Sequence, residues 1–373
     1  MIRKYLQKIF KKISYGIYLK IYGSIEDSTD STNDSRIEVK TLKKENNIIY
    51  KVYNISKGRL YTDRIHNIAA IIDNKIIEGP SFQLKDGPES TIQISDTTDN
   101  IVFKKGTPRL LRNLNGSVLS LLIGGAGNNN YWHWMYDVLP KFELCSRYFN
   151  LDEIDFFLLP GLQKKFQKQT LDCLNIPEHK RISSEKFRHI KAKKLIITDH
   201  PVLTTGNATK DIQNIPNWII AWLKEKFINK DKIINKKNKI YIDRNDEKLN
   251  YSSKRLIKNE EEIKKYLLEN NFILAKLHNM NFIDQVNLFY NAECVVGLHG
   301  GGFGNIAFCK SGTKIIELKS LTAGDVIKNL ALKLKLNYNS IAAASEGIER
   351  FYFSNQQGSI RIPLNKLMEM LEN

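Results

Sequence analysis

The chain has 373 residues, 42% of them hydrophobic and 26% charged, and its net charge is +17 at neutral pH. This length suffices for two domains with separate cores, and the composition suits a globular protein. The charge favours an acidic partner, which could be nucleic acid, an anionic membrane surface or a phosphorylated substrate. The basic residues are spread along the chain without an arginine-rich block, an RNA-binding aromatic signature or a zinc finger, which argues against nucleic acid.

Residues 1–23 repeat apolar side chains at helical spacing, and lysine and arginine fill much of the remainder. A basic amphipathic helix of this kind suits an anchor on an anionic membrane surface. It equally suits a helix that packs on its own domain or on a dimer partner, and both interpretations stay open. Residues 24–36 are polar and rich in Ser, Thr and Asp, which predicts a flexible linker.

The next part of the chain, to residue 123, contains short β-branched runs separated by turn residues. These runs predict strands at 48–52, 69–72, 76–77, 92–94 and 101–103, with a hairpin turn at Asp73-Asn74. A stronger strand over 117–123 ends in a Gly/Asn-rich loop, and a helix follows over 131–149. Further strands are expected at 156–159 and 195–198, with a helix at about 162–174 between them.

From residue 216 onwards helices and strands alternate regularly. We expect strands at 240–242, 272–275, 295–298 and 315–318, and helices at 218–227, 255–269, 283–292 and 325–334, with a last helix at 363–371. Such alternation predicts βαβ units around a parallel sheet, so the fold class is α/β. Ligands of these sheets bind beyond the carboxyl ends of the strands.

A glycine-rich loop follows the strand at 295–298. The candidate ligand-binding residues of this loop are His299, Gly300, Gly301, Gly302 and Asn305. Glycines let a backbone approach a ligand closely, and the N–H groups that open the next helix favour an anion, so a phosphate or diphosphate is expected. The loop matches neither a dinucleotide fingerprint nor a P-loop, and the chain lacks the G-x-S-x-G of serine hydrolases. A tight turn with purely structural glycines is the alternative.

His133 and Asp137 are four residues apart and share one face of the helix at 131–149. A carboxylate beside an imidazole can fix its tautomer and raise its basicity, which suits a general base. Either residue could be that base. The alternative is a helix-capping histidine beside a solvated aspartate.

Other candidate residues lie near the same expected sheet edge. Arg244 follows a strand, and Arg255, Asn259 and Glu260 open the next helix. The fork of an arginine suits a diphosphate, and Glu317, in an apolar strand, could accept hydrogen bonds from a ribose. Singly these are ordinary surface or capping residues. The chain contains no D-x-D, H-x-x-x-H or H-E-x-x-H, so no metal cofactor is indicated.

In order along the chain, three motifs resemble glycosyltransferase family 61, formerly a domain of unknown function that includes bacterial capsular polysaccharide biosynthesis proteins. The first is His-Trp-x-x-Asp-x-Leu-Pro at 133–140, followed by Lys141 where the family often has arginine. The second is Arg244 followed by Arg-x-x-x-Asn-Glu at 255–260. The third is His-Gly-Gly-Gly-x-x-Asn at 299–305, with Gly301 where alanine is usual, and Glu317 downstream. The resemblance covers roughly residues 60–345.

The resemblance implies a GT-B fold, in which two Rossmann-like domains face each other across a cleft. It implies inverting, metal-independent transfer of a hexose or pentose from a nucleotide sugar to a hydroxyl of a glycan or lipid-linked glycan, in capsule or lipopolysaccharide synthesis. Arg244, His299, the glycines, Asn305 and Glu317 would hold the donor, with His133 and Asp137 across the cleft. A non-catalytic subunit that binds sugar nucleotides is the alternative.

These expectations divide the chain into an N-terminal acceptor-side domain over 37–210, a nucleotide-sugar-binding domain over 211–345, and a C-terminal segment over 346–373. The four cysteines are far apart and suit buried thiols of a reducing compartment. With no signal peptide and no apolar run of membrane-spanning length, we expect a cytoplasmic protein held on the inner face of the membrane by residues 1–23. The sequence does not specify the sugar, the nucleotide base, the linkage or the oligomeric state.

Overall fold

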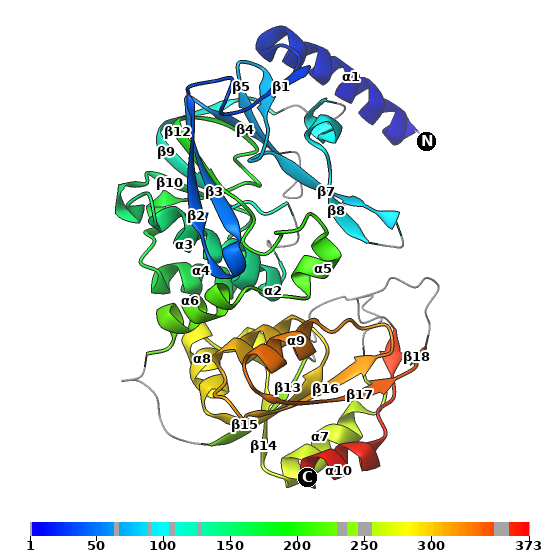
Figure 1. The fold of residues 1–373 in the computed structure, drawn as a ribbon. Helices are drawn as coiled ribbons and strands as arrows, with labels where there is room; N and C mark the ends of the chain where they lie inside the picture. Colours follow the sequence, from blue (N-terminus) through cyan, green and yellow to red (C-terminus); the bar gives the residue numbers. More distant parts are fainter. Residues whose placement is uncertain are drawn as a thin grey trace. The chain divides into compact units, whose positions relative to one another are not determined.

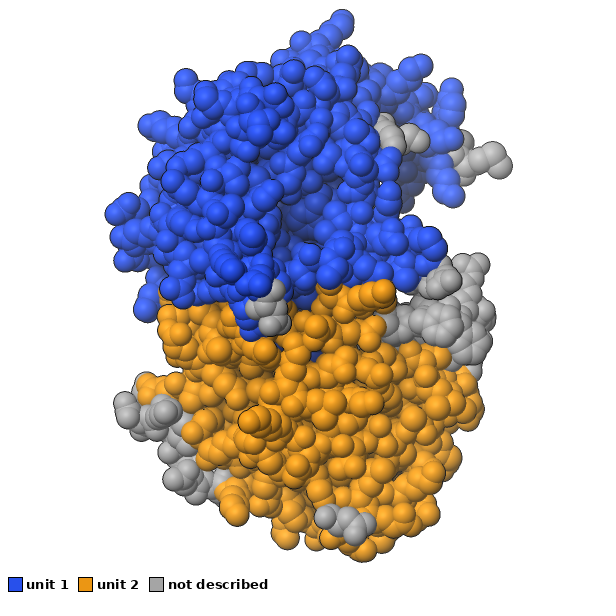
Figure 2. All heavy atoms as spheres, viewed as in Figure 1, with its two compact units in different colours: residues 1–167, 175–208 blue, residues 168–174, 209–373 orange. Residues whose placement is uncertain are grey.

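The structure is a computed structural model that describes residues 2–62, 67–88, 91–103, 109–124, 129–229, 237–244, 256–346 and 358–372 (Figure 1). Contacts divide the chain into two compact units, coloured separately in Figure 2. Unit 1 contains residues 1–167 and 175–208, and unit 2 contains residues 168–174 and 209–373. Both are mixed α/β structures that contain parallel strands, as the alternation in the sequence predicts for the second half.

Unit 2 is built on a five-stranded sheet in which every neighbouring pair of strands is parallel. Its strands are β13 (Asn238–Ile242), β14 (Phe272–Ala275), β15 (Ala292–Leu298), β16 (Lys314–Ser320) and β17 (Asn337–Ala343). Their order is β14-β13-β15-β16-β17. The chain thus moves from β13 to β14 on one side, then returns to β15 on the other, so the order reverses between β13 and β15. In doubly wound sheets of this order, ligands bind beyond the carboxyl ends of the strands at such a reversal.

Helices cover both faces of this sheet, which explains why most residues of its central strands are buried. On one face, α7 (Glu260–Glu269) and α10 (Leu364–Glu372) bury Ile263, Leu267 and Leu367 with side chains of the strands. The other face is covered by α8 (Phe282–Tyr290) and α9 (Val326–Lys333) (Figure 1). These two helices and α6 (Asn217–Phe227) pack against the 3-10 helix η10 (Gly301–Phe308), which follows β15. The remaining short elements are α5 (Ala208–Ile212), β18 (Ser345–Glu346) and β19 (Ser359–Ile360).

Unit 1 combines a parallel layer with antiparallel strands. Strands β9 (Arg112–Ser120), β10 (Phe156–Leu159), β11 (Arg181–Ser183) and β12 (His189–Thr198) are parallel in the order β12-β9-β10-β11. The chain passes from β9 to β10 and β11 on one side, then returns to β12 on the other, so here too the strand order reverses, between β9 and β12. Three helices belong to this layer: α2 (Tyr131–His133), α3 (Pro140–Ser146) and α4 (Lys165–Cys173), the last assigned mostly to unit 2.

The antiparallel strands extend the sheet from β12. They are β2 (Ile37–Lys43), β3 (Ile49–Ser56), β4 (Arg59–Tyr61), β5 (Asn67–Ile72), β6 (Lys75–Ile77), β7 (Phe82–Asp86) and β8 (Ile92–Ile94). The predicted hairpin is confirmed, since β5 and β6 are antiparallel and Asp73 and Asn74 between them both have positive φ. The strand expected at 101–103 is wrong. These residues form a short 3-10 helix after Asn100, whose side chain donates to the Ile68 carbonyl and accepts from the Val102 N–H.

The predicted N-terminal helix is present as α1 (Ile2–Tyr22). The prediction of a flexible linker over 24–36 is wrong in part, because β1 (Asp27–Thr29) pairs in parallel with β6 and Ile25 is buried. The polar composition hid this strand, since only Ile25 supplies an apolar anchor for it.

The unit boundary at 208/209 lies near the expected 210/211, but residues 168–174 group with unit 2. The expected separate segment over 346–373 is not separate in its described part, because Ile360, Ile362 and Leu367 belong to the core of unit 2. Residues this apolar pack into the nearest core rather than remain on its surface.

Candidate active site

His133 and Asp137 form a hydrogen-bonded pair in unit 1. Asn130 caps the helix, its side-chain oxygen accepting from the Trp132 N–H at 2.9 Å, which places His133 in the first helical turn. The His133 Nδ1 and the Asp137 Oδ2 are 2.6 Å apart. Asp137 is buried, while 22% of the His133 side chain is exposed. A proton on Nδ1 satisfies the carboxylate and makes Nε2 the proton-accepting nitrogen.

The turn that carries Asp137 is a π-helix, Trp134–Val138, closed by a bond of 3.0 Å from the Leu139 N–H to the Trp134 carbonyl. Pro140 explains why this turn is a π-helix. Proline lacks an N–H, and its ring clashes with the carbonyl four residues earlier in an α-helix. A widened turn relieves that clash. Such turns are frequent at functional sites.

A second histidine, His200, faces the same carboxylate. It follows β12, and its Nε2 lies 4.0 Å from the Asp137 Oδ2. The Val202 and Leu203 N–H groups donate to its Nδ1 at 3.2 and 3.1 Å, which requires that nitrogen to be unprotonated. The sequence gives no hint of this residue, because it lies more than sixty positions from its partner and in no motif.

Lys141 is fully buried beneath this cluster. Its Nζ donates to the Leu122 and Thr198 carbonyls, both at 3.0 Å, and so ties together the carboxyl ends of β9 and β12. The strand order reverses between these two strands, and doubly wound sheets bind ligands at such an edge. The structure therefore assembles His133, Asp137, His200 and Lys141 at the ligand-binding edge of the parallel layer of unit 1.

Burial and charge set the protonation of this cluster. Burial lowers the pKa of His133, but the charge and hydrogen bond of Asp137 outweigh it, so that its pKa lies above the ordinary value. Burial lowers the pKa of His200 to about 4, which keeps this imidazole neutral. Burial also lowers the pKa of Lys141 to about 7, although Asp199 and Asp137 act in the opposite direction. The raised pKa of His133 agrees with the basicity expected of an imidazole beside a carboxylate.

In unit 2, Arg244 and His299 meet at the carboxyl ends of β13 and β15. Arg244 Nη1 donates to the His299 carbonyl at 2.9 Å, and the His299 N–H donates to the Leu318 carbonyl at 2.8 Å. The order of the sheet reverses between these two strands. The predicted arginine and the glycine-rich loop therefore come together at the edge where such sheets bind ligands.

Glu317 lies beneath this loop, fully buried within β16. One of its oxygens bonds to His299 Nδ1, and the other accepts from the Tyr338 hydroxyl on β17. Both oxygens thus have partners within unit 2, and the expectation that Glu317 receives ribose hydroxyls stays a prediction. Its role in the structure is to orient His299. Tyr338 was missed because it lies in no motif and its strand is only half-buried.

The glycines of the loop are needed for close contacts. A Cβ on Gly300 would lie 3.0 Å from Arg244 Nη1, and one on Gly302 would lie 3.1 Å from Ile242 Cγ2 and 3.2 Å from Leu277 Cδ1. The first contact is with the end of a flexible side chain, whereas the second is with packed apolar groups. Gly300 therefore leaves room for Arg244, and Gly302 lets η10 lie on β13.

Three other predicted residues make hydrogen bonds within the fold of unit 2. Asn305 is fully buried, and its amide donates to Gln285 and to the Gly302 carbonyl. Asn259 exchanges hydrogen bonds with the backbone of Ile362. Glu260 accepts from the Tyr241 hydroxyl at 2.8 Å. These bonds hold the fold together, and direct contact of the three residues with a donor stays a prediction. Arg255 lies outside the described residues.

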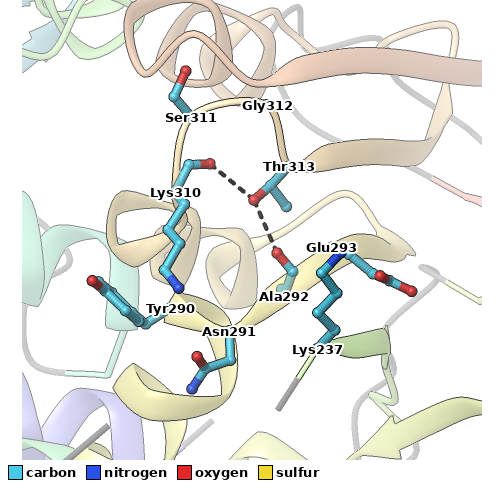
Figure 3. A pocket seen from close by; sticks show the side chains of 9 residues that line it. All are labelled: Lys237, Tyr290, Asn291, Ala292, Glu293, Lys310, Ser311, Gly312 and Thr313. Atoms are coloured by element: carbon cyan, nitrogen blue, oxygen red, sulfur yellow. Dashed lines mark hydrogen bonds between the residues drawn. The ribbon is translucent and has the colours of Figure 1, made fainter. Parts of the chain in front are cut away.

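A shallow hollow of about 400 Å³ occurs elsewhere in unit 2, where β15 and β16 begin (Figure 3). Lys310 Nζ lies 4.4 Å from the centre of the Tyr290 ring there, and Thr313 Oγ1 is bonded to the Ala292 and Lys310 carbonyls. The hollow is at the amino ends of the strands and so lies away from Arg244 and His299.

Within the described parts of the chain, no group of three or more His, Cys, Asp or Glu side chains is placed to hold a metal ion. The four cysteines are free thiols, three of them buried. Among the helices of the described residues, none combines the length and apolarity needed to cross a bilayer.

The model of the family Glycosyltransferase 61 matches residues 131–316. The match begins just before His133, includes Arg244 and the glycine-rich loop, and ends one residue before Glu317. The chain belongs to glycosyltransferase family 61. No curated protein matches the chain. The match confirms the family that the three motifs indicate, over a narrower range than the 60–345 of the resemblance.

Membership of family 61 indicates that the chain is a glycosyltransferase, with a sugar donor and an acceptor as substrates. The two clusters of the chain are alike in two respects. Each cluster lies where the strand order of a parallel layer reverses, and each pairs an imidazole with a buried carboxylate. The two differ in their access to solvent, because 22% of the His133 side chain is exposed and only 9% of that of His299.

Proposed function

We propose that this family 61 enzyme transfers a hexose or pentose from a nucleotide sugar to a hydroxyl of a glycan acceptor, with inversion at the anomeric carbon. The observation that carries the proposal is the meeting of Arg244 with the His299 loop where the sheet order of unit 2 reverses. The nucleotide diphosphate of the donor would lie at this edge. The glycine backbone would approach its oxygens, and the Arg244 guanidinium would balance their charge.

The transfer is proposed to need no metal ion. The chain lacks the D-x-D pair that commonly holds a divalent ion on a nucleotide diphosphate. The negative charge that develops on the leaving diphosphate would instead be met by Arg244, His299 and the N–H groups of the loop. Glu317 and Tyr338 would act one step removed, by holding the imidazole of His299 in place.

His133 is the proposed general base. Because Nδ1 is engaged by Asp137, Nε2 would take the proton of the acceptor hydroxyl while the acceptor oxygen bonds to the anomeric carbon. The bond from that carbon to the diphosphate oxygen breaks on the opposite face, so the configuration inverts. Asp137 is too buried to reach an acceptor, which favours His133 as the base and gives Asp137 the orienting role.

The larger setting of the reaction is also a proposal. From the resemblance we expect a GT-B arrangement, with the donor on unit 2 and the acceptor on unit 1. The acceptor would be a glycan or lipid-linked glycan of a bacterial capsule or lipopolysaccharide, extended on the cytoplasmic side of the membrane. The basic net charge suits a phosphorylated substrate or an anionic membrane surface.

A binding screen tests the donor site directly. We expect one or more nucleoside diphosphates from a panel of bases to raise the melting temperature in the presence of EDTA. A ligand at a hundred times its Kd stabilises the folded state by about 2.7 kcal/mol. Arg244→Ala should remove the shift. A shift that occurs only with magnesium or manganese would contradict metal-free binding. Donor binding without transfer to any glycan would favour the non-catalytic alternative.

A further inference from the structure

Helix α1 presents two different apolar faces. Near its C-terminal end, the Tyr18 ring packs at a tilt against Tyr61 and His189, and Tyr22 lies against His189 and beneath the Arg59 guanidinium. The Tyr22 hydroxyl accepts from the Leu111 N–H at 3.0 Å. These contacts hold the end of the helix on unit 1. The interpretation that the helix packs on its own domain is therefore correct for this tyrosine face.

A second set of apolar side chains is exposed along the whole helix. It consists of Tyr5, Leu6, Ile9, Phe10, Ile13, Ile17 and Ile21, which are between 39% and 65% exposed. At 100° per residue these positions form one continuous stripe, and the tyrosine face lies roughly opposite to it. Contiguous exposed apolar surfaces of this kind mark interaction sites. We call this set the isoleucine stripe.

Charge identifies the partner that fits the stripe. Helix α1 contains six basic residues and no acidic residue. In a dimer formed through the stripe, two such helices would lie side by side and their charges would repel each other. An anionic lipid surface would attract the same charges while its acyl boundary accepted the isoleucines. Lys4, Lys8 and Lys11 lie on the side away from the stripe. Arg3 and Lys20 lie at helical positions within the stripe or at its border, from which their long side chains would extend to the headgroups.

We propose that the isoleucine stripe of α1 lies in the plane of an anionic membrane surface, and that the tyrosine face connects it rigidly to unit 1. Residues 2–13 extend over about 18 Å of helix, and residues 3–13 are exposed throughout. Gly23, with φ of +76°, ends the helix where the chain turns into β1. The membrane-bound element would therefore orient unit 1 instead of tethering it loosely.

Vesicle sedimentation with the full-length protein tests this inference. Vesicles of phosphatidylglycerol and phosphatidylcholine should bind the protein at low salt, and pure phosphatidylcholine should bind it much less. Ile13→Lys adds a positive charge but interrupts the stripe, and it should weaken binding at least about tenfold. The matched control Gln7→Lys adds the same charge outside the stripe and should bind at least as well as the wild type. Circular dichroism checks that both variants fold.

The outcomes that overturn the inference are distinct. If Ile13→Lys binds as tightly as Gln7→Lys, the attraction is purely electrostatic and the stripe is not embedded. If the protein ignores anionic vesicles and Ile13→Lys converts a dimer to a monomer in ultracentrifugation, the stripe belongs to a second copy. Equal binding to neutral vesicles would exclude the role of the charges. The assay needs no transfer activity, so its failure leaves the proposed reaction unaffected.

Discussion

The Asp137 carboxylate lies near two histidines and affects the pKa of each differently. Its Oδ2 is bonded to His133 at 2.6 Å, but it lies 4.0 Å from His200, which already receives two backbone N–H groups. The pKa of His133 is therefore raised, while burial holds that of His200 at about 4. The carboxylate thus raises the basicity of one imidazole, beside a second imidazole that burial keeps neutral. Such an arrangement suits a proton-transfer site.

Asp137→Asn should move the titration of His133 to lower pH. In the proposed mechanism the base is the neutral imidazole, so wild-type turnover should rise with pH through the raised pKa of His133. Without the carboxylate charge only burial remains, and it lowers the pKa. We expect the acidic limb of the pH profile to shift downward and turnover to fall by about 10²–10⁴. An NMR titration of His133 measures the shift independently. An unchanged limb would mean that Asp137 does not control the base.

Lys141 makes stability depend on pH. The pKa of this lysine is about 7 in the folded chain and has an ordinary value of 10.5. Between these values the unfolded chain binds a proton that the folded chain does not, so the free energy of unfolding rises with pH there. The slope is at most about 1.4 kcal/mol per pH unit. Lys141→Met should remove this pH dependence. In urea unfolding, the free energy of unfolding of the wild type relative to the variant should therefore increase by on the order of 2 kcal/mol between pH 7.5 and pH 9. A constant difference would exclude this explanation.

At the scale of elements, the sequence predicts what local patterns determine. The β5–β6 hairpin follows from Asp73-Asn74, and α6 begins at Asn217 after Pro216 as expected. Structural features that depend on residues distant in the sequence are not predicted. Strand β1 is too polar to recognise without β6, and the π-turn at 134–138 depends on where Pro140 falls in the helix. The buried roles of Asn305 and Glu317 depend on Gln285 and Tyr338, which no motif connects to them.

Two glycines of the η10 loop should respond differently to alanine. In Gly300→Ala the backbone φ of +159° strains an L side chain and the new Cβ meets the flexible end of Arg244, so stability should fall and nucleotide affinity should also fall about tenfold as the guanidinium is displaced. In Gly302→Ala the Cβ meets Ile242 and Leu277 in packed surroundings, and stability should fall by about 1–3 kcal/mol. Thermal unfolding and calorimetry separate the two effects. Unchanged nucleotide affinity in folded Gly300→Ala would show that Gly300 is purely structural.

At the scale of the whole molecule, the two units repeat one design. Each has a parallel layer with one reversal of strand order, and each places a histidine and a buried carboxylate at the carboxyl ends of the strands beside it. The alternation of strands and helices predicts the layer in unit 2. In unit 1 the parallel layer is harder to predict, because β12 also pairs with the antiparallel strands β3 and β4. The sequence thus locates both motifs but not the order of strands that gives them an equivalent position.

The central claim is that donor binding and proton transfer belong to different units. The test is to measure nucleotide affinity and turnover in His133→Ala and Arg244→Ala. Affinity is measured by calorimetry in EDTA, with the nucleoside diphosphate that stabilises the wild type most. We predict that His133→Ala keeps its nucleotide affinity within about twofold but loses about 10²–10⁴ in turnover. Arg244→Ala should lose at least about tenfold in affinity. Equal loss of nucleotide affinity in both folded variants would contradict this division between the units.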